Sequence, residues 1–251
     1  MSTVDSRPKA LVTGAARGIG QASAVALLKR GFDVVLVDKQ ADVLEETAHL
    51  LSDLGKVLPL VCNVADFGLV QKLGAQAIRD WGPMDVLVNN AGAPSPKRLL
   101  DISEAEWDDA IAVNLKGCFN WCKALAPAMY EGRGGRIVII SSVSAQTGAG
   151  PTAVSKIAYC AAKAGLLGMT RGLARELAPK VLVNAICPGI TDTAQTRDRI
   201  ASQYDRIVQQ VPLGRLGTPE DIAEVVAFLA GAEPMFINGE IIDVDGGQYI
   251  N

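Results

Sequence analysis

A tyrosine and a lysine, Tyr159 and Lys163, stand four positions apart in the segment IAYCAAKAG. If this segment is helical, the two side chains share one face, so the lysine ammonium lies beside the phenol. A neighbouring positive charge favours the phenolate and lowers the pKa of a tyrosine from its usual value of about 10. Such a tyrosine can exchange a proton with an alcohol or a ketone. Many helices bring these two residue types together by chance, so the rest of the chain must decide whether the pair is catalytic.

Short apolar runs alternate with helical patterns along the chain, and these elements must position the pair. The predicted strands are residues 9–13, 32–38, 56–62, 84–90, 135–141, 181–187 and 240–245. The predicted helices end near Arg30 and Leu54, cover 66–81, 103–130 and 219–230, and include one that carries Tyr159 and ends near Ala178. This alternation predicts an α/β fold with a parallel sheet, which is either doubly wound with helices on both faces or closed as a TIM barrel.

A glycine-rich segment, TGAARGIG, follows the first predicted strand. Gly14, Gly18 and Gly20 permit a tight turn and a close approach of the backbone to a pyrophosphate, and the next helix directs its positive end at the phosphates. The spacing between the first two glycines is one residue longer than in the standard dinucleotide fingerprint. This loop favours a seven-stranded doubly wound (Rossmann) sheet over the barrel.

Asp38 ends the second predicted strand, where an acidic side chain can accept hydrogen bonds from the ribose hydroxyls of adenosine. A carboxylate at this position repels a 2′-phosphate, so we expect NAD to be preferred over NADP. Arg17 and Lys39 argue for NADP, because both could attract that phosphate.

Composition limits the other functions that need to be considered. The 251 residues carry a net charge of −3 without a cluster of lysine or arginine, which argues against nucleic-acid binding. The sequence has no signal-peptide pattern and no apolar run of membrane-spanning length, so we expect a cytoplasmic protein that binds no membrane. Five scattered cysteines suggest neither a disulfide framework nor a metal site, and the only histidine, His49, lies in a polar stretch. Histidine-based acid–base catalysis is therefore not expected.

The order of these motifs resembles that of the short-chain dehydrogenase/reductase family. The resemblance rests on TGAARGIG at 13–20, NNAG at 89–92, Asn114, Ser142, Tyr159 with Lys163, and Pro188-Gly189. It extends from about Lys9 to Gln248. It implies a nicotinamide-dependent oxidoreductase that interconverts a secondary alcohol and a ketone. No repeat or linker divides the chain, so residues 1–251 are expected to form one domain.

The resemblance implies a role for each catalytic residue. Tyr159 would be the general acid and base, while Lys163 would lower its pKa and bind the nicotinamide ribose. Ser142 would orient and polarise the substrate oxygen. Asn114 would bend its helix and position a water that links the lysine to solvent. An ordinary polar residue in a kinked helix is an equally good interpretation of Asn114.

The resemblance also implies the cofactor contacts. Asn90 and Gly92 would flank the adenosine ribose, whereas Asn89 would tie neighbouring backbone segments together. Ile190 and Thr193 would hold the carboxamide and the phosphates. The complete predicted cofactor site comprises Gly14, Arg17, Gly18, Ile19, Gly20, Asp38, Asn63, Val64, Asn90, Gly92, Tyr159, Lys163, Ile190 and Thr193.

Two features depart from the family pattern. Asn63 stands where the family commonly has an aspartate that faces adenine, and its amide oxygen can accept the same hydrogen bond. Ser142 and Tyr159 are seventeen positions apart, a longer spacing than is typical. The extra residues fall in QTGAGPTAVSK, residues 146–156, where Gln146 is predicted to contact a polar or anionic substrate together with Ser142 and Tyr159. We expect Lys156 to lie at a solvated helix start.

Residues 190–217 resemble the flap that closes over substrate in this family. The polar residues within 190–212 favour a hydroxylated substrate such as a sugar, polyol or sugar acid, unless they face solvent; they include Thr191, Asp192, Gln195, Arg197 and Tyr204. The chain also resembles 3-oxoacyl-carrier-protein reductases, which generally use NADPH, and reduction of a 3-oxoacyl thioester is the alternative function.

Two further functions are possible for this fold. The fold also occurs in NAD-binding regulators without turnover, but these have no need of an intact Ser142, Tyr159 and Lys163. An epimerase or dehydratase on a nucleotide-sugar scaffold would need a longer substrate domain.

Family resemblance implies a homotetramer, in which the helices around Asn114 and Tyr159 form one interface. The small residues of 158–168 would allow a close helix–helix contact there.

Overall fold

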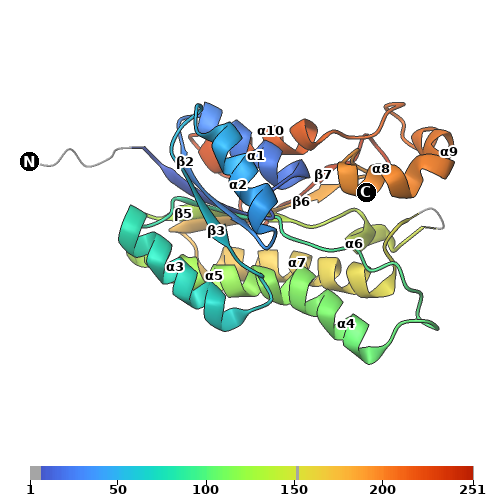
Figure 1. Ribbon diagram of the computed structural model, residues 1–251, viewed down its shortest axis with the longest axis horizontal. Helices are drawn as coiled ribbons and strands as arrows, with labels where there is room; N and C mark the ends of the chain where they lie inside the picture. The colour runs from blue at the N-terminus through green and yellow to red at the C-terminus, as the bar shows by residue number, and fades with distance from the viewer. Residues whose placement is uncertain (1–6, 151–152, 251) are drawn as a thin grey trace, which may run out of the picture.

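The computed structural model describes residues 7–150 and 153–250, and its centre is one parallel sheet (Figure 1). The seven strands lie in the order β3-β2-β1-β4-β5-β6-β7, and every neighbouring pair is parallel. They are β1 (Lys9–Thr13), β2 (Asp33–Asp38), β3 (Val57–Val61), β4 (Val86–Asn89), β5 (Gly135–Ile140), β6 (Val181–Pro188) and β7 (Ile241–Val244). The doubly wound sheet is confirmed. The barrel alternative is wrong, because β3 and β7 form two separate edges.

Helices cover both faces of the sheet (Figure 1). One face carries α1 (Gly18–Lys29), α2 (Ala41–Leu51) and α10 (Pro219–Gly231). The other face carries α3 (Phe67–Trp81), α5 (Gly117–Glu131) and α7 (Ile157–Glu176). Four shorter helices lie nearer the carboxyl ends of the strands: α4 (Glu104–Ile111), α6 (Ser144–Thr147), α8 (Ala194–Ile200) and α9 (Tyr204–Val208).

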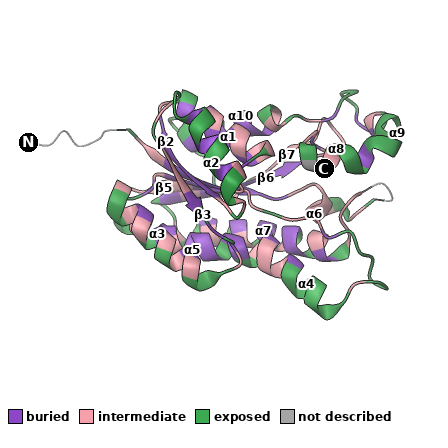
Figure 2. Cartoon of the chain, in the orientation of Figure 1, coloured by how far each residue is buried: buried purple, intermediate pink, exposed green. Residues whose placement is uncertain are grey.

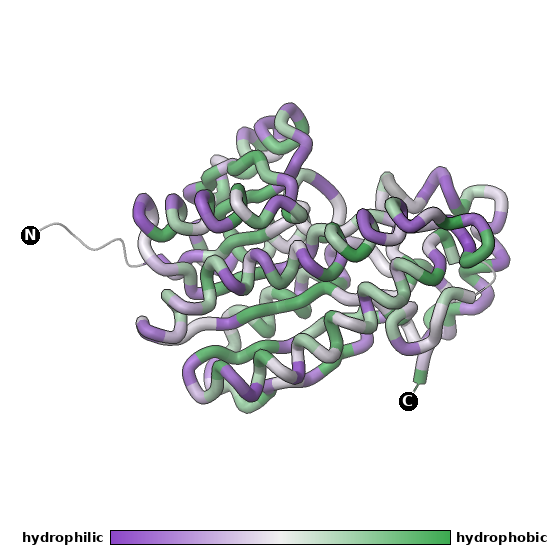
Figure 3. The backbone as a smooth tube through the Cα atoms, turned by 90° about the horizontal axis from the view of Figure 1, so that it is seen from below, coloured by the Kyte–Doolittle hydropathy of each residue, from purple (hydrophilic) through white to green (hydrophobic). Residues whose placement is uncertain are grey.

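Alternation along the strands divides the core in two. Successive side chains of a strand point to opposite faces of the sheet. In β1, Leu11 therefore packs with Trp121 of α5, whereas Ala10 and Val12 pack with Leu27 of α1. The strands are hydrophobic along most of their length (Figure 3), and the helices bury only the side that faces the sheet (Figure 2).

Two segments differ from their predicted structure. The single predicted helix over 103–130 is broken by a π-helical turn, Ala112–Lys116, which separates α4 from α5. Residues 190–217, which show no apolar rhythm, contain α8 and α9. Thr193 caps the start of α8, because its side chain accepts a hydrogen bond from the Thr196 amide and so satisfies a free donor of the first turn.

The strand order places a crevice at the carboxyl edge of the sheet. The chain leaves β1 for β2 on one side, and it later enters β4 on the other side of β1. The connections that follow these strands therefore diverge above β1 and β4, which is where doubly wound sheets bind ligands. Gly14, Asn90 and Ser142 follow the ends of β1, β4 and β5, so residues far apart in sequence meet at this edge.

Candidate active site

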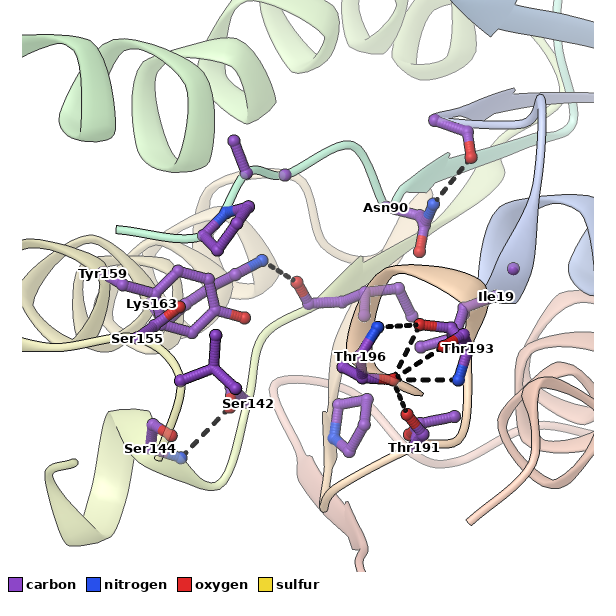
Figure 4. A pocket seen from close by; sticks show the side chains of 18 of the residues that line it. Ile19, Asn90, Ser142, Ser144, Ser155, Tyr159, Lys163, Thr191, Thr193 and Thr196 are labelled. Carbon is purple, nitrogen blue, oxygen red and sulfur yellow. Dashed lines mark hydrogen bonds between the residues drawn. The ribbon is translucent and has the colours of Figure 1, made fainter. Parts of the chain in front are cut away.

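A cavity of about 890 Å³ opens at this carboxyl edge. Figure 4 shows Ser142, Tyr159 and Lys163 gathered on one side of it and Thr191, Thr193 and Thr196 on the opposite side. The predicted site residues that line it are Gly14, Arg17, Gly18, Ile19, Asp38, Asn63, Val64, Asn90, Gly92, Ser142, Tyr159, Lys163, Ile190 and Thr193. Among the described residues, Gly20, Asn114 and Gln146 were predicted for the site but do not belong to the cavity lining.

The glycine loop is held close to the start of α1. Gly14 has a φ of +66°, in the left-handed region that glycine tolerates best. A Cβ at Gly20 would lie only 2.0 Å from the carbonyl oxygen of Gly14. Gly20 therefore shapes the site without lining the cavity, because its lack of a side chain lets the glycine loop pack against α1.

Asn90 fixes the same loop from β4. Its Nδ2 donates hydrogen bonds to the carbonyl oxygens of Thr13, at 2.9 Å, and Gly14, at 3.2 Å. The Thr13 hydroxyl accepts hydrogen bonds from the amides of Asn90 and Ala91. The backbone tie predicted for Asn89 is thus made by Asn90, since the Asn89 amide contacts the Cys122 sulfur at 3.3 Å.

Asp38 lies beside the glycine loop at the cavity wall. Its carboxylate accepts hydrogen bonds from the Ala16 amide at 3.3 Å and from the Gln40 amide at 3.1 Å. Arg17 and Lys39 line the same cavity, so both of the expected competing charges are present. The nearby Asn63 is exposed, and its Oδ1 accepts a hydrogen bond from the Ala65 amide at 3.1 Å.

Tyr159 and Lys163 share one face of α7, as the spacing predicts. The Lys163 Nζ lies 5.6 Å from the centre of the Tyr159 ring and donates a hydrogen bond to the Ile140 carbonyl at 2.7 Å. In return, the Ser141 hydroxyl donates to the Lys163 carbonyl at 2.9 Å. These two bonds join α7 to the end of β5, next to Ser142.

The expected decrease in the pKa of Tyr159 is not found. Burial raises this pKa to about 12, and a hydrogen bond with Ser142 opposes the increase. Burial also lowers the pKa of Lys163 to about 8. Burial disfavours the charged form of each residue, and at Tyr159 this effect outweighs the attraction of the neighbouring lysine.

Asn114 lies in the π-helical turn and is almost fully buried. Its Oδ1 accepts a hydrogen bond from the Ala93 amide, and its Nδ2 donates to the carbonyls of Ala93 and Ala110. These bonds anchor the π-helical turn that separates α4 from α5, at the residue for which the resemblance implies a bend. A Cβ at Gly92 would lie 2.9 Å from the Asn114 Oδ1 and 3.6 Å from the Lys163 Nζ, so this glycine permits the close packing behind the lysine.

The loop between Ser142 and Tyr159 is arranged differently from the prediction. The Gln146 side chain donates a hydrogen bond to the Asp243 carboxylate, which turns it away from the predicted substrate contact. The Lys156 ammonium donates to the Ala153 carbonyl at 2.7 Å, at the start of α7. Pro151 and Thr152 of this loop lie outside the described residues.

The carboxyl-terminal segment contributes residues that the sequence did not reveal. Gln248 and Tyr249 line the cavity, and the Gln248 Oε1 accepts a hydrogen bond from the Ile190 amide at 3.0 Å. Asp245 holds this segment in place through the amides of Gly247 and Tyr249. No motif signals the arrangement, because it depends on how the chain folds back after β7.

Comparison with known proteins agrees with this geometry. Residues 14–248 match the family described as enoyl-(acyl carrier protein) reductase. A short-chain type dehydrogenase/reductase of Sinorhizobium fredii is 37% identical over 248 residues, covering 96% of this chain and 97% of the relative. The chain belongs to the short-chain dehydrogenase/reductase family. The resemblance carried by the motifs is confirmed, and an oxidoreductase that uses a nicotinamide cofactor follows from it.

Other relatives of this chain have names that state a substrate. The 3-oxoacyl-(acyl-carrier-protein) reductases FabG of Escherichia coli and Thermotoga maritima are 40% and 38% identical over 242 residues, covering 96% of this chain and 97% of each relative. A solved variant of actinorhodin polyketide ketoreductase with NADPH superimposes with a TM-score of 0.91 at 33% identity and covers 99% of both chains. Within residues 7–150 and 153–250, no helix has the length and apolar character needed to cross a membrane.

Proposed function

We propose that this protein is a ketoreductase that interconverts 3-oxoacyl and 3-hydroxyacyl thioesters. The observation that carries the proposal is the grouping of Ser142, Tyr159 and Lys163 at one wall of the cavity, beside a glycine loop shaped for a dinucleotide. The similarity to the FabG proteins supports the thioester substrate. The sequence alone predicts a hydroxylated substrate, and the apolar side chains at the cavity wall favour the acyl chain of a thioester instead.

Some polar groups of the proposed flap, residues 190–217, bind one another. Asp192 and Arg197 form an ion pair at 3.0 Å, and the Thr196 hydroxyl donates to the Thr191 carbonyl at 2.6 Å. The placement of the Gln195 side chain lies outside the described residues. Apolar side chains on the cavity wall, including Val154, Ile190 and Ile200, fit an acyl chain better than a polyol.

The residues present fit a nicotinamide dinucleotide. Gly14 and Gly18 line the cavity and would let the loop approach a pyrophosphate closely, and the amino end of α1 supplies free amides at the same place. Asp38, Asn63 and Asn90 line the cavity on the side of the loop and would hold the adenosine. Ile190 and Thr193 line the opposite side and would hold the nicotinamide and phosphates.

The chain's own residues would handle the substrate oxygen and its proton. Ser142 donates a hydrogen bond to the carbonyl oxygen, which holds and polarises it. Tyr159 has a high pKa and is protonated at neutral pH, so it can give its proton to that oxygen and complete the hydroxyl group. When bound, the reduced nicotinamide supplies the hydride that forms the new C–H bond. Lys163 on α7, held by its hydrogen bond to the end of β5, would orient the phenol and the ribose.

We propose NAD as the preferred cofactor. Asp38 supports this choice, because its carboxylate lies on the cavity wall and would repel a 2′-phosphate. The solved polyketide ketoreductase was described with NADPH, and Arg17 and Lys39 supply charges that would suit that cofactor. Binding measurements with both cofactors must therefore accompany any substrate assay.

We also propose that the protein forms a homotetramer. Phe119 and Tyr130 on α5 are 47% and 40% exposed, which supports a partner surface on that side of the sheet. Gly168 of α7 leaves open space where a side chain would stand, so a second helix could approach closely. Light scattering that finds only monomer at assay concentrations would remove this proposal.

The proposed reaction is tested by a substrate screen with both cofactors. Purified protein is given 3-oxoacyl thioesters, simple ketones and secondary alcohols, sugars and polyols, and the nicotinamide absorbance is followed. We expect the highest kcat/KM for a 3-oxoacyl thioester with NADH. Turnover of a polyol without turnover of any thioester would overturn the proposal and restore the hydroxylated substrate predicted from the sequence.

A further inference from the structure

The loop between α6 and α7 forms one wall of the cavity. Its longer spacing between Ser142 and Tyr159 places additional residues where substrate would enter. The described residues of this loop that line the cavity are Gly148, Gly150, Ala153, Val154 and Ser155. The loop is therefore a candidate for what distinguishes the substrate pocket of this chain.

One side of the loop is anchored to the segment that follows β4. The Lys156 amide donates a hydrogen bond to the Ser95 carbonyl at 2.7 Å, and the Ser95 amide donates to the Ser155 hydroxyl at 3.3 Å. Ser95 is itself buried, and its neighbour Pro94 lines the same cavity. Buried Ser95 thus holds the Lys156 backbone and the Ser155 side chain, the two residues that follow Val154, so Val154 cannot easily withdraw from the pocket.

The other side of the loop contacts the flap. Val154 packs against a small apolar cluster that contains Ile200 at the end of α8 and Ile207 of α9. Both isoleucines are almost completely buried, and Val154 and Ile200 also line the cavity. Val154 thus joins the anchored loop to the flap across the cavity wall. A valine is stiff about χ1, so it has few ways to move aside for a larger group.

We propose that Val154 is a specificity-determining residue that limits the length of the acyl chain the pocket accepts. This inference rests on the proposed function, because it concerns the acyl part of a 3-oxoacyl thioester. A short chain fits in front of Val154, where it packs against the apolar cluster of the flap. A longer chain must displace Val154 from this cluster and expose apolar surface, which costs free energy that a short chain avoids.

The test compares chain lengths in matched variants. The values of kcat/KM are measured for a series of 3-oxoacyl thioesters, from acetoacetyl to long-chain, with wild type, Val154→Ala and Val208→Ala. Val208 belongs to the same apolar cluster but not to the cavity lining, so its truncation removes the same two methyl groups without enlarging the pocket. We expect Val154→Ala to raise the long-to-short ratio of kcat/KM by about tenfold or more. Val208→Ala should leave this ratio unchanged.

A larger side chain supplies a second arm. Val154→Phe should lower the ratio, because kcat/KM should fall more for long chains than for acetoacetyl. Thermal unfolding and NADH affinity are measured for each variant, so that a folding defect is recognised. An unchanged ratio in Val154→Ala, or an equal shift in Val208→Ala, would overturn the role of Val154. If wild type reduces no 3-oxoacyl thioester of any length, the proposed function fails first and this inference falls with it.

Discussion

The side-chain nitrogen of Lys163 lies 2.7 Å from the carbonyl oxygen of Ile140, at the last residue of β5. This hydrogen bond ties the middle of α7 to the sheet, and it reaches the backbone two residues before Ser142. The position of the lysine, and of Tyr159 on the same helix face, is therefore set by the rigid sheet. Lys163 is only 3% exposed, so the bond forms in a place where an ammonium group is poorly solvated.

Replacement of Lys163 should change how stability depends on pH. Its pKa is lowered from 10.5 to about 8 in the folded protein, so between these values the unfolded chain binds more protons than the folded chain. Stability then rises with pH across this window, while below about pH 8 the cost of burying the charge is fully present. Tyr159 acts oppositely above pH 10, where the folded protein keeps a proton that the unfolded chain loses.

Urea unfolding of wild type and Lys163→Met between pH 8 and pH 10 measures this effect. The free energy of unfolding of wild type should rise relative to the variant by about 2 kcal/mol over the window. The cysteine thiols titrate in both proteins, so they largely cancel in the difference. A difference that stays constant with pH would show that the lysine is not neutralised by burial.

Tyr159→Phe should separate catalysis from binding. The variant keeps the ring and loses the hydroxyl that gives the proton, so kcat should fall by about 10²- to 10⁴-fold. The NADH dissociation constant should change little. Tyr130→Phe is the matched control, because Tyr130 is 40% exposed on α5 and does not line the cavity. Full turnover by Tyr159→Phe would mean that another group supplies the proton.

The elements were predictable because their signals are local. Apolar runs such as those of β1 and β5 end at turn residues, and the glycine loop and Asp38 are recognisable from their places after strands. The partner of Gln146 was not predictable, since Asp243 lies 97 residues further along the chain. The raised pKa of Tyr159 is not predictable from the sequence for a related reason. The charge of Lys163 four residues away is visible in the sequence, whereas the burial of Tyr159 depends on the folded core.

Asp38 should control the choice between the two cofactors. The Ala16 and Gln40 amides bind different oxygens of the Asp38 carboxylate, so Asp38→Asn removes the charge and keeps one of these two hydrogen bonds. Loss of a charged hydrogen-bond acceptor should weaken NADH binding by about 10- to 100-fold and relieve repulsion of NADPH. Isothermal titration with both cofactors measures the change. Unaltered discrimination in Asp38→Asn and Asp38→Ala would contradict the NAD preference.

Gly20→Ala should damage the dinucleotide loop, although Gly20 itself does not line the cavity. The new Cβ would lie 2.0 Å from the Gly14 carbonyl oxygen and 2.6 Å from the Asn90 Nδ2, the two atoms that hydrogen-bond to each other and hold the loop. We expect a loss of about 1 to 3 kcal/mol in the free energy of unfolding, together with weaker NADH binding.

Gly172→Ala provides the comparison, because a Cβ at this position of α7 meets nothing within 4 Å. It should raise the free energy of unfolding by about 0.5 to 1 kcal/mol, since alanine favours a helix interior. Chemical unfolding and NADH titration of both variants give the two readouts. If Gly20→Ala folds with wild-type stability and binds NADH normally, the loop must be able to move away from α1, and the close contact between Gly14 and Gly20 would not be needed for the cofactor site.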